Sequence, residues 1–293
     1  MSMRDRFYDV LTELVRDDDR LAVVLGDIGV SRLPDLQRIV NVGIREQLMI
    51  GVASGLALEG LRPVAHSYAP FLVERPFEQI KLDFGHQGVG AVLVSVGASY
   101  DASTEGRTHQ APEDVALLAN LPGWAIHVPG HEDEMEHQLR TAVRGDGCVY
   151  IRLDARSNRE PHHSESVVVV ERGSPGAATV LAVGPMLDPV VAALDGADVT
   201  IAYTATVRPL DGEGLRVATE SEADLVVVEP YLEGTSHHAV SVALGANVRR
   251  VFSVGYQLRE SRRYGTPQDH LRDHGLDPAG LSLRLRGILD PPA

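Results

Sequence analysis

Cysteine is almost absent from this 293-residue chain, which contains Cys148 alone. One thiol excludes an internal disulfide framework and a multi-cysteine metal site, and it fits a reducing cytoplasm, where we expect the protein to be located. Long apolar runs are also missing, since the stretch at 91–96 is far too short to cross a bilayer. Early charges at Arg4, Asp5 and Arg6, followed by apolar residues at helical spacing, predict an amphipathic helix rather than a signal peptide.

Basic residues are in the minority, with 27 Lys plus Arg against 41 Asp plus Glu and a formal charge of -14. This balance argues against a general nucleic-acid or anionic-membrane surface, so an anionic substrate has to be met by local arginines. No expected strand leads into a GxGxxG motif, which disfavours a nicotinamide-binding Rossmann enzyme. With 44% hydrophobic residues, the chain can bury a substantial core in one or two domains.

Short β-branched runs alternate with amphipathic helical segments along most of the chain, which predicts an α/β fold with open, largely parallel sheets. The polar, aperiodic segment at 154–166 predicts a boundary between two sandwich domains. We therefore expect domains at 1–157 and 167–293 with a linker at 158–166. The expected strands are 22–26, 39–42, 63–67, 91–96, 125–128, 149–153, 179–183, 199–203, 225–229 and 251–254. The expected helices are 45–58, 71–84, 113–120, 132–144, 187–194, 211–221, 237–244 and 267–274.

Glu46 is the most informative residue, because it follows an expected strand in the segment NVGIREQLMIGVASGLALEG at 41–60. An isolated glutamate in a first helical turn is ordinarily explained by the helix dipole and the free N–H groups. Here Gly51, Ser54 and Gly55 give the helix a narrow face, which suggests a buried contact, with another subunit as one option. A partly desolvated carboxylate suits a group that shares a proton with a weakly basic heterocycle.

GIREQ followed by GVASGLALEG resembles the glutamate segment of the pyrimidine-binding domain in transketolases, 1-deoxyxylulose-5-phosphate synthases and 2-oxo acid dehydrogenase beta subunits. The resemblance implies that Glu46 is catalytic and binds thiamine diphosphate by stabilising the imino tautomer of its aminopyrimidine. In HSYAPFLVERPFEQIKLDF at 66–84, helical spacing alone makes the aromatic residues core residues. The resemblance instead assigns Tyr68 and Phe71 to the aromatic pocket around the aminopyrimidine. Glu74 falls where transketolases often carry an aromatic residue.

The loop DASTEGRTHQAPED at 101–114 leads into an expected helix. A lone histidine in such a loop is more often a solvated surface residue. The string resembles the DGPTHQ signature of transketolases and deoxyxylulose-phosphate synthases, and the match extends into PEDVALL. The resemblance implies that His109 contacts substrate oxygen atoms and assists proton transfer, with Gln110 as a weaker companion.

Several positions depart from the family pattern or extend the expected substrate site. Glu105 replaces the usual aspartate that contacts the donor hydroxyl, Arg107 replaces proline and is a candidate for an anionic group, and Gly97 replaces a substrate-contacting histidine. Arg152, in VYIRLD, aligns with an arginine that binds the sugar-phosphate end of substrates, although a salt-bridged arginine at a strand end is nearly as good an account. Ser31 matches a phosphate-contacting serine.

The assembly is inferred from what a complete transketolase carries upstream, namely a GDG motif and a following asparagine for Mg²⁺ and diphosphate. The GDG at 145–147 lies between a helix and a strand and is followed too soon by Asn158, so it indicates a turn. The resemblance implies no metal ligand in this chain. It implies a separate N-terminal subunit with the GDG motif, which holds Mg²⁺ and shares the cofactor, and self-association through the pyrimidine-binding domain in a heterotetramer.

We therefore expect a pyrimidine-binding fold followed by a transketolase C-terminal-domain-like fold. The expected function is the catalytic subunit of a two-component transketolase that moves a ketol unit between sugars or sugar phosphates and is active only with its partner. One alternative is the beta subunit of a 2-oxo acid dehydrogenase or acetoin-cleaving complex, which passes its acyl group to lipoamide. Another is a non-catalytic assembly or regulatory subunit, in which Glu46→Gln leaves activity unchanged.

Overall fold

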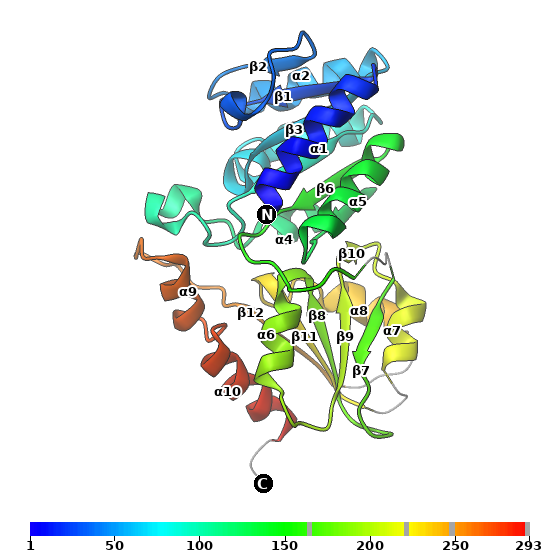
Figure 1. The fold of residues 1–293 in the computed structure, drawn as a ribbon, viewed down its shortest axis with the longest axis vertical. Coiled ribbons are helices and arrows are strands. Elements are labelled where there is room, and N and C mark those ends of the chain that lie inside the picture. Colours follow the sequence, from blue (N-terminus) through cyan, green and yellow to red (C-terminus); the bar gives the residue numbers. More distant parts are fainter. Residues whose placement is uncertain (163–165, 220–222, 246–249, 291–293) are drawn as a thin grey trace.

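The computed structural model describes residues 1–162, 166–219, 223–245 and 250–290. Two α/β units lie one above the other, the N-terminal unit in blue to green and the C-terminal unit in green to red (Figure 1). The first sheet has the strand order β10-β5-β6-β4-β3-β1-β2. All neighbouring strands pair in parallel except β10 and β5. Its strands are β1 (Leu21–Leu25), β2 (Ile39–Asn41), β3 (Arg62–Tyr68), β4 (Val92–Val96), β5 (Trp124–His127), β6 (Cys148–Arg152) and β10 (Thr206–Arg208).

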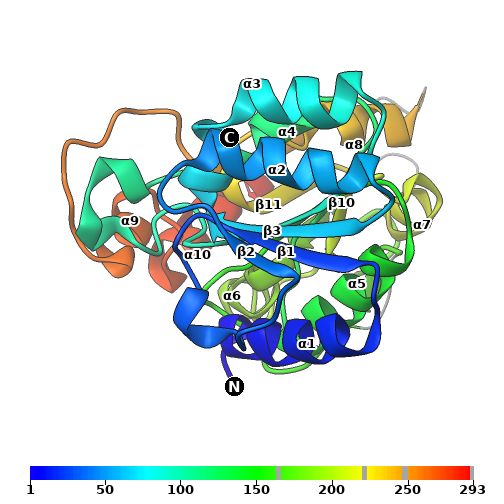
Figure 2. The same ribbon diagram turned by 90° about the horizontal axis from the view of Figure 1, so that it is seen from above.

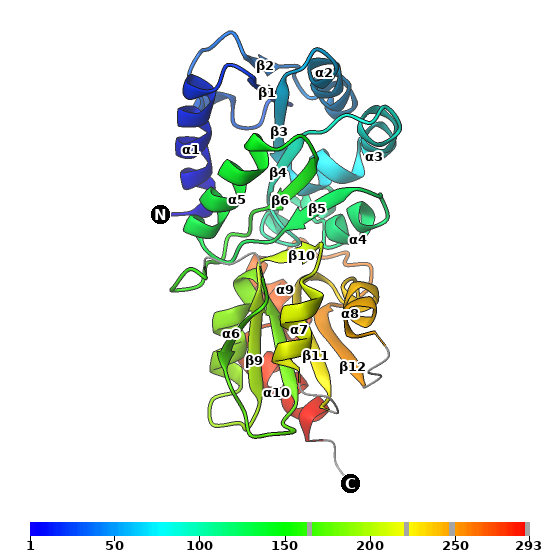
Figure 3. The ribbon, with the colours of Figure 1, turned by 90° about the vertical axis from the view of Figure 1, so that its right-hand side faces the viewer.

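Helices cover both faces of the first sheet, as the views from above and from the side show (Figures 2 and 3). On one face, α1 (Met3–Asp17) lies beside α5 (Glu132–Arg144). The apolar residues Phe7, Leu11 and Val15 of α1 recur at helical spacing and are fully buried, because they form the stripe that faces the sheet. On the other face lie α2 (Glu46–Leu58), α3 (Phe77–Gln79) and α4 (Asp114–Ala119).

The second sheet has the order β12-β11-β8-β9-β7, with β7 antiparallel at one edge. Its strands are β7 (Val168–Glu171), β8 (Thr179–Val183), β9 (Thr200–Thr204), β11 (Leu225–Leu232) and β12 (Val251–Tyr256). The helices are α6 (Leu187–Ala193), α7 (Gly212–Ala218), α8 (His237–Leu244), α9 (Pro267–Asp273) and α10 (Pro278–Leu289). Buried residues of α6 and α10 pack on one face and those of α7 and α8 on the other. The expected α/β class with two open sheets is therefore confirmed.

The helix expected at 71–84 is the clearest local error. The segment forms a π-helical turn η2 (Pro70–Glu74), the short α3, and a second π-helical segment η3 (Ile80–His86). Pro76 lacks a backbone N–H and cannot continue a helix that precedes it, so the chain restarts there. The N–H of Arg75 bonds the carbonyl of Pro70 at 3.1 Å, which fixes the π turn.

The short edge strands β7 and β10 and the helix α10 were not expected. Because β10 belongs to the C-terminal half but pairs with β5, the first sheet takes one strand from beyond the expected boundary. At the start of the expected linker 158–166, Asn158 is buried and donates to the carbonyl of Gly184 at 3.1 Å. Residues 163–165 of that linker, and the end of the helix expected at 211–221, lie outside the described residues. The domain limits 1–157 and 167–293 remain a prediction.

None of the helices in the described ranges combines the length and the apolar character needed to span a membrane.

Candidate active site

The candidate residues lie where parallel strands of the first sheet end. Glu46 begins α2 shortly after β2, Tyr68 ends β3, and His109 lies in the 3-10 turn η5 (Arg107–His109) on the loop after β4. The carboxyl ends of parallel strands form one edge of an open sheet, and ligands of such sheets bind at that edge. The alternation of strands and helices therefore brings these side chains together across more than sixty residues of sequence.

Glu46 is buried at the start of α2, with 4% of its surface exposed. Nη1 of Arg75 donates to Oε1 of Glu46 at 2.9 Å, and the two side chains form an ion pair. The guanidinium carbon of Arg75 also lies 3.8 Å from the centroid of the Phe71 ring. The carboxylate that the sequence singles out is thus buried and paired, and its partner Arg75 covers an aromatic face.

Tyr68, Phe71 and His109 form what we call the aromatic cluster. The ring centroids of Phe71 and His109 are 4.8 Å apart, and those of Tyr68 and His109 are 5.5 Å apart, both in edge-to-face geometry. Tyr68 and Phe71 also contact each other edge to face, with centroids 5.9 Å apart. Through Arg75, this cluster joins Glu46, so the structure brings the expected cofactor and proton-transfer residues into one site.

Gly97 explains part of the cluster's geometry. Its φ of 68° lies in the left-handed region, and a Cβ atom there would be 2.3 Å from Cδ1 of Tyr68. A side chain at this position would push Tyr68 out of the cluster. The glycine that stands in place of the family's histidine is therefore required by the position of the tyrosine ring.

Acidic groups surround Arg107. It forms ion pairs with Glu113 at 3.6 Å and Glu260 at 3.2 Å, so its charge is already engaged. Nearby, burial and then the charge of Glu113 raise the pKa of Glu74 to about 7, against the opposing charge of Arg107. Glu105 is exposed at the end of the 3-10 turn η4 (Ser103–Glu105).

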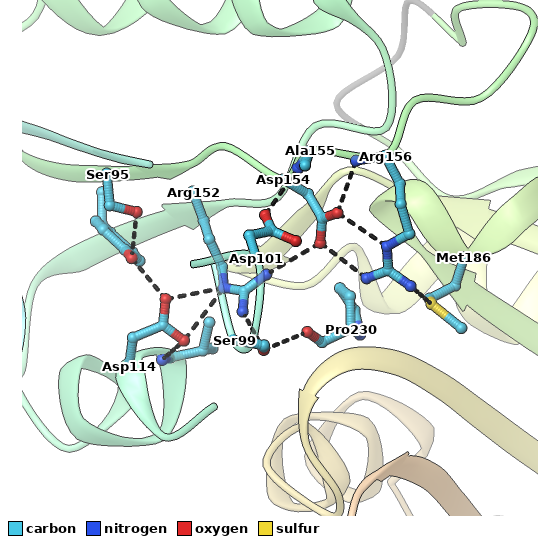
Figure 4. A network of polar contacts seen from close by, with 12 residues as sticks. Ser95, Ser99, Asp101, Asp114, Arg152, Asp154, Ala155, Arg156, Met186 and Pro230 are labelled. Atoms are coloured by element: carbon cyan, nitrogen blue, oxygen red, sulfur yellow. Dashed lines mark hydrogen bonds and ion pairs between the residues drawn. The ribbon is translucent and has the colours of Figure 1, made fainter. Parts of the chain in front are cut away.

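Arg152 is fully buried, which favours the account of a salt-bridged structural arginine, while its expected contact with a substrate phosphate stays a prediction. Its Nε donates to the carboxylate of Asp114 at 2.8 Å, and its Nη2 donates to Oγ of Ser99 at 2.6 Å (Figure 4). Ser99 in turn donates to the carbonyl of Pro230 in the second unit. These contacts fit a salt-bridged structural arginine, although Nη1 of Arg152 has no hydrogen-bond partner among the described residues and lies 3.7 Å from the carboxylate of Asp154.

Two further expectations meet a different environment. Gln110 is buried and its amide donates to the carbonyl of Arg263 at 3.3 Å, which gives it a structural contact. Ser31 is exposed in the 3-10 turn η1 (Val30–Arg32). It takes part neither in the ring contacts of the aromatic cluster nor in the ion pair between Arg75 and Glu46.

The narrow face of α2 is used within the chain. Oγ of Ser54 donates to the carbonyl of Asp83 in η3 at 2.6 Å, and a Cβ atom on Gly51 would lie 3.6 Å from the Asp83 carboxylate. η3 therefore makes the expected close approach at Gly51 and Ser54, whereas a Cβ atom on Gly55 would meet nothing within 4 Å. Three large apolar residues of this region, Ile44, Leu48 and Leu58, are exposed beside the exposed polar residues Arg45, Gln47 and Glu59.

Arg75 is the site residue that the sequence analysis missed. Its spacing of four residues from Phe71 is a signal that was available, because side chains four apart on a helix are neighbours. In a π turn, however, residues four apart are not in the positions they have in an α-helix, and no sequence pattern predicts a π turn. The contact with Glu46, 29 positions away, depends on the tertiary fold.

A cavity of about 260 Å³ adjoins the aromatic cluster and is lined by residues that include Tyr68, Gly97, Asp101 and Asp154. A larger one of about 640 Å³ lies between α4 and α8, and none of the candidate residues lines it. No group of three or more His, Cys, Asp and Glu side chains that could hold a metal ion occurs in the part of the chain that the structure describes.

Comparison with known proteins shows which family the chain belongs to. Residues 1–160 match the family model described as "Transketolase, pyrimidine binding domain". The chain is 47% identical over 293 residues to an uncharacterized 33.6 kDa protein in the fasciation locus of Rhodococcoides fascians, covering 97% of this chain and 93% of that protein. It is 29% identical to the 6-deoxy-6-sulfo-D-fructose transketolase subunit SqwH of Clostridium sp. (strain MSTE9), covering 84% and 81%.

A solved structure titled "Split gene transketolase, inactive beta4 tetramer" has the same fold, with a TM-score of 0.83 and 24% identity over 99% of this chain and 98% of that one. The family match and the transketolase relatives imply a chain of the thiamine-diphosphate-dependent class, and the solved structure has the same fold. The chain belongs to the transketolase family and corresponds to its C-terminal half, as a transketolase-like subunit.

Proposed function

We propose that this chain is the catalytic C-terminal subunit of a two-component transketolase that moves a two-carbon ketol unit between sugars or sugar phosphates. The observation that supports it most is the buried Glu46 carboxylate, which pairs with Arg75, whose guanidinium lies over the face of Phe71. An aminopyrimidine needs a carboxylate at its ring nitrogen and flat aromatic neighbours, so the residues present fit this half of thiamine diphosphate. The bound cofactor supplies the electron sink that lets a ketose carbon–carbon bond break.

The residues of the chain then have distinct roles. Glu46 orients the aminopyrimidine and holds or releases a proton at its ring nitrogen. Phe71 and Tyr68 flank the ring and exclude water from one side. His109, which is half-buried against both rings, positions a substrate hydroxyl and moves its proton. Glu105 contacts a donor hydroxyl, while Arg107 and Ser31 extend the substrate site at its exposed side.

We further propose that the diphosphate and Mg²⁺ are held by a separate N-terminal subunit in a heterotetramer. Two observations support a multi-subunit arrangement: the relative from Clostridium is a named subunit matched over 81% of its length, and the similar solved structure is titled an inactive β4 tetramer. Ile44, with 72% of its surface exposed, and Leu48, with 48%, are apolar residues near Glu46 in the sequence that a second chain would cover.

Glu46→Gln tests the proposal in the complex reconstituted with its N-terminal subunit. We expect ketol transfer to fall by at least about a hundredfold, because proton exchange at the aminopyrimidine loses its partner. Glu59→Gln is the matched control, since Glu59 is exposed at the other end of the same helix. Unchanged activity in Glu46→Gln would point to a non-catalytic subunit, and activity that requires a lipoyl protein would point to a dehydrogenase or acetoin-cleaving complex.

A further inference from the structure

The side chain of Arg75 makes two contacts that coincide with those the cofactor ring requires. Its Nη1 lies 2.9 Å from Oε1 of Glu46, and its guanidinium carbon lies 3.8 Å from the centre of the Phe71 ring. A guanidinium is planar and carries N–H groups along its edges, so it stacks on an aromatic face while it donates to a carboxylate. Arg75 therefore satisfies the catalytic carboxylate and covers the aromatic face at the same time.

An aminopyrimidine is also planar and needs the same carboxylate and the same kind of face. Two flat groups cannot occupy one face of Phe71 and one hydrogen-bonding edge of Glu46 together. We propose that Arg75 is a placeholder: in the free subunit it occupies the aminopyrimidine position, and it must swing away when the cofactor and the partner chain dock. This proposal rests on the proposed role of Glu46, and it adds an autoinhibitory contact to that site.

The surroundings let the side chain leave without moving the backbone. The Arg75 side chain is 39% exposed, so water can solvate its charge after it leaves. The backbone is held separately, because the N–H of Arg75 bonds the carbonyl of Pro70 and Nε2 of Gln47 donates to the carbonyl of Arg75 at 3.2 Å. The movable part is thus the guanidinium and its stem, while the π turn remains fixed.

The test uses the isolated full-length chain and a probe that reports on this half of the site alone, 4-amino-5-hydroxymethyl-2-methylpyrimidine, titrated by calorimetry or NMR. We expect Arg75→Ala to bind this pyrimidine about three- to tenfold more tightly than the wild type, because the probe no longer competes with a partly exposed ion pair and a cation–π contact. Arg75→Lys keeps the charge but loses the planar face, and its affinity should lie between the two.

Arg250→Ala is the matched control. Arg250 also pairs with a carboxylate, that of Asp224 at 3.0 Å, and lies 5.6 Å from the ring centre of Phe252, but in the second unit. Its removal should leave pyrimidine binding unchanged, and melting curves should confirm that each variant folds. Equal, weaker or undetectable binding in Arg75→Ala overturns the placeholder role.

The double variant Arg75→Ala, Glu46→Gln separates failure of this inference from failure of the proposed function. We expect it to lose the gain seen in Arg75→Ala, because the pyrimidine then lacks its carboxylate partner. If Arg75→Ala gains affinity and the double variant keeps that gain, Glu46 is not the pyrimidine ligand, and the proposal, which rests on that role, falls with it. If the double variant loses binding while Arg75→Ala gains nothing, only the placeholder is refuted.

Discussion

Removing the buried guanidinium of Arg152 should destabilise the protein strongly. Arg152 and Asp114 have no exposed side-chain surface, and their ion pair at 2.8 Å lies in the network that joins the two units. In Arg152→Met, the Asp114 carboxylate keeps only the hydroxyl of Tyr150 at 2.7 Å and the N–H of Val115 at 2.8 Å. Deleting one partner of such a pair costs about 3 to 5 kcal/mol, because an uncompensated charge stays buried.

The measurement is the melting temperature of the isolated chain. For a chain of this size, 1 kcal/mol shifts Tm by roughly 2 to 4 °C, so Arg152→Met should melt about 10 °C below the wild type. Arg250→Met is the control for an exposed pair, whose side chains are 66% and 25% exposed, and it should shift Tm by less than about 3 °C.

A double-mutant cycle sharpens the test. Asp114→Asn together with Arg152→Met removes both charges, so the double variant should be less destabilised than the sum of the two single variants. The reasoning is refuted if Arg152→Met melts within about 2 °C of the wild type. If Arg152→Met kept its stability but lost activity toward phosphorylated substrates alone, that result would support the substrate role for Arg152.

Other expectations follow from the same site. Because burial raises the pKa of Glu74 from 4.5 to about 7, the folded chain holds that proton more strongly than the unfolded chain, and this contribution to stability is lost as the pH rises through about 7. The Tm of Glu74→Gln should therefore exceed that of the wild type by more at about pH 8 than at about pH 5. Equal Tm differences at the two pH values would contradict the raised pKa of Glu74. Gly97→Ala should lower stability by about 1 to 3 kcal/mol in urea titrations, because it strains a left-handed residue and displaces Tyr68; an unchanged midpoint would argue against that packing. The isolated chain should bind thiamine diphosphate poorly and turn over no substrate, whereas tight calorimetric binding without a partner would show that the site is complete in one chain.

The alternation of strands and helices predicted those parts of the fold that depend on the hydrophobic pattern of a single segment. Glu46 and Tyr68 could be placed correctly at strand ends, because buried β-branched runs and the following helices are visible in the sequence. The three-residue strand β10 could not, since a strand of that length exists only through its pairing with β5. The π turn before Pro76 was also invisible, because proline indicates where a helix stops but not how the preceding turn is wound.

The environment of Arg152 was harder to predict, because its partners come from distant positions. Asp114 lies 38 positions earlier and Ser99 lies 53 positions earlier. The sequence left two roles open for Arg152, substrate ligand or structural ion pair. The burial of its guanidinium favours the structural ion pair, and burial of a polar group at a strand end depends on which loops pack over it.

In the proposed site, which two chains would share, the ion pair between Arg75 and Glu46 reconciles two requirements. In the complex, the carboxylate has to be desolvated beside an aromatic ring, but an unpaired carboxylate buried in the free subunit would lower its stability. In the proposal, the Arg75 guanidinium neutralises that charge until the pyrimidine binds. Because its side chain is partly exposed, it can leave the carboxylate and be solvated by water. The exposed apolar residues Ile44 and Leu48 lie next to this pair in sequence. A partner that covers them would desolvate Arg75 as well, so docking itself would favour exchanging the arginine for the neutral ring.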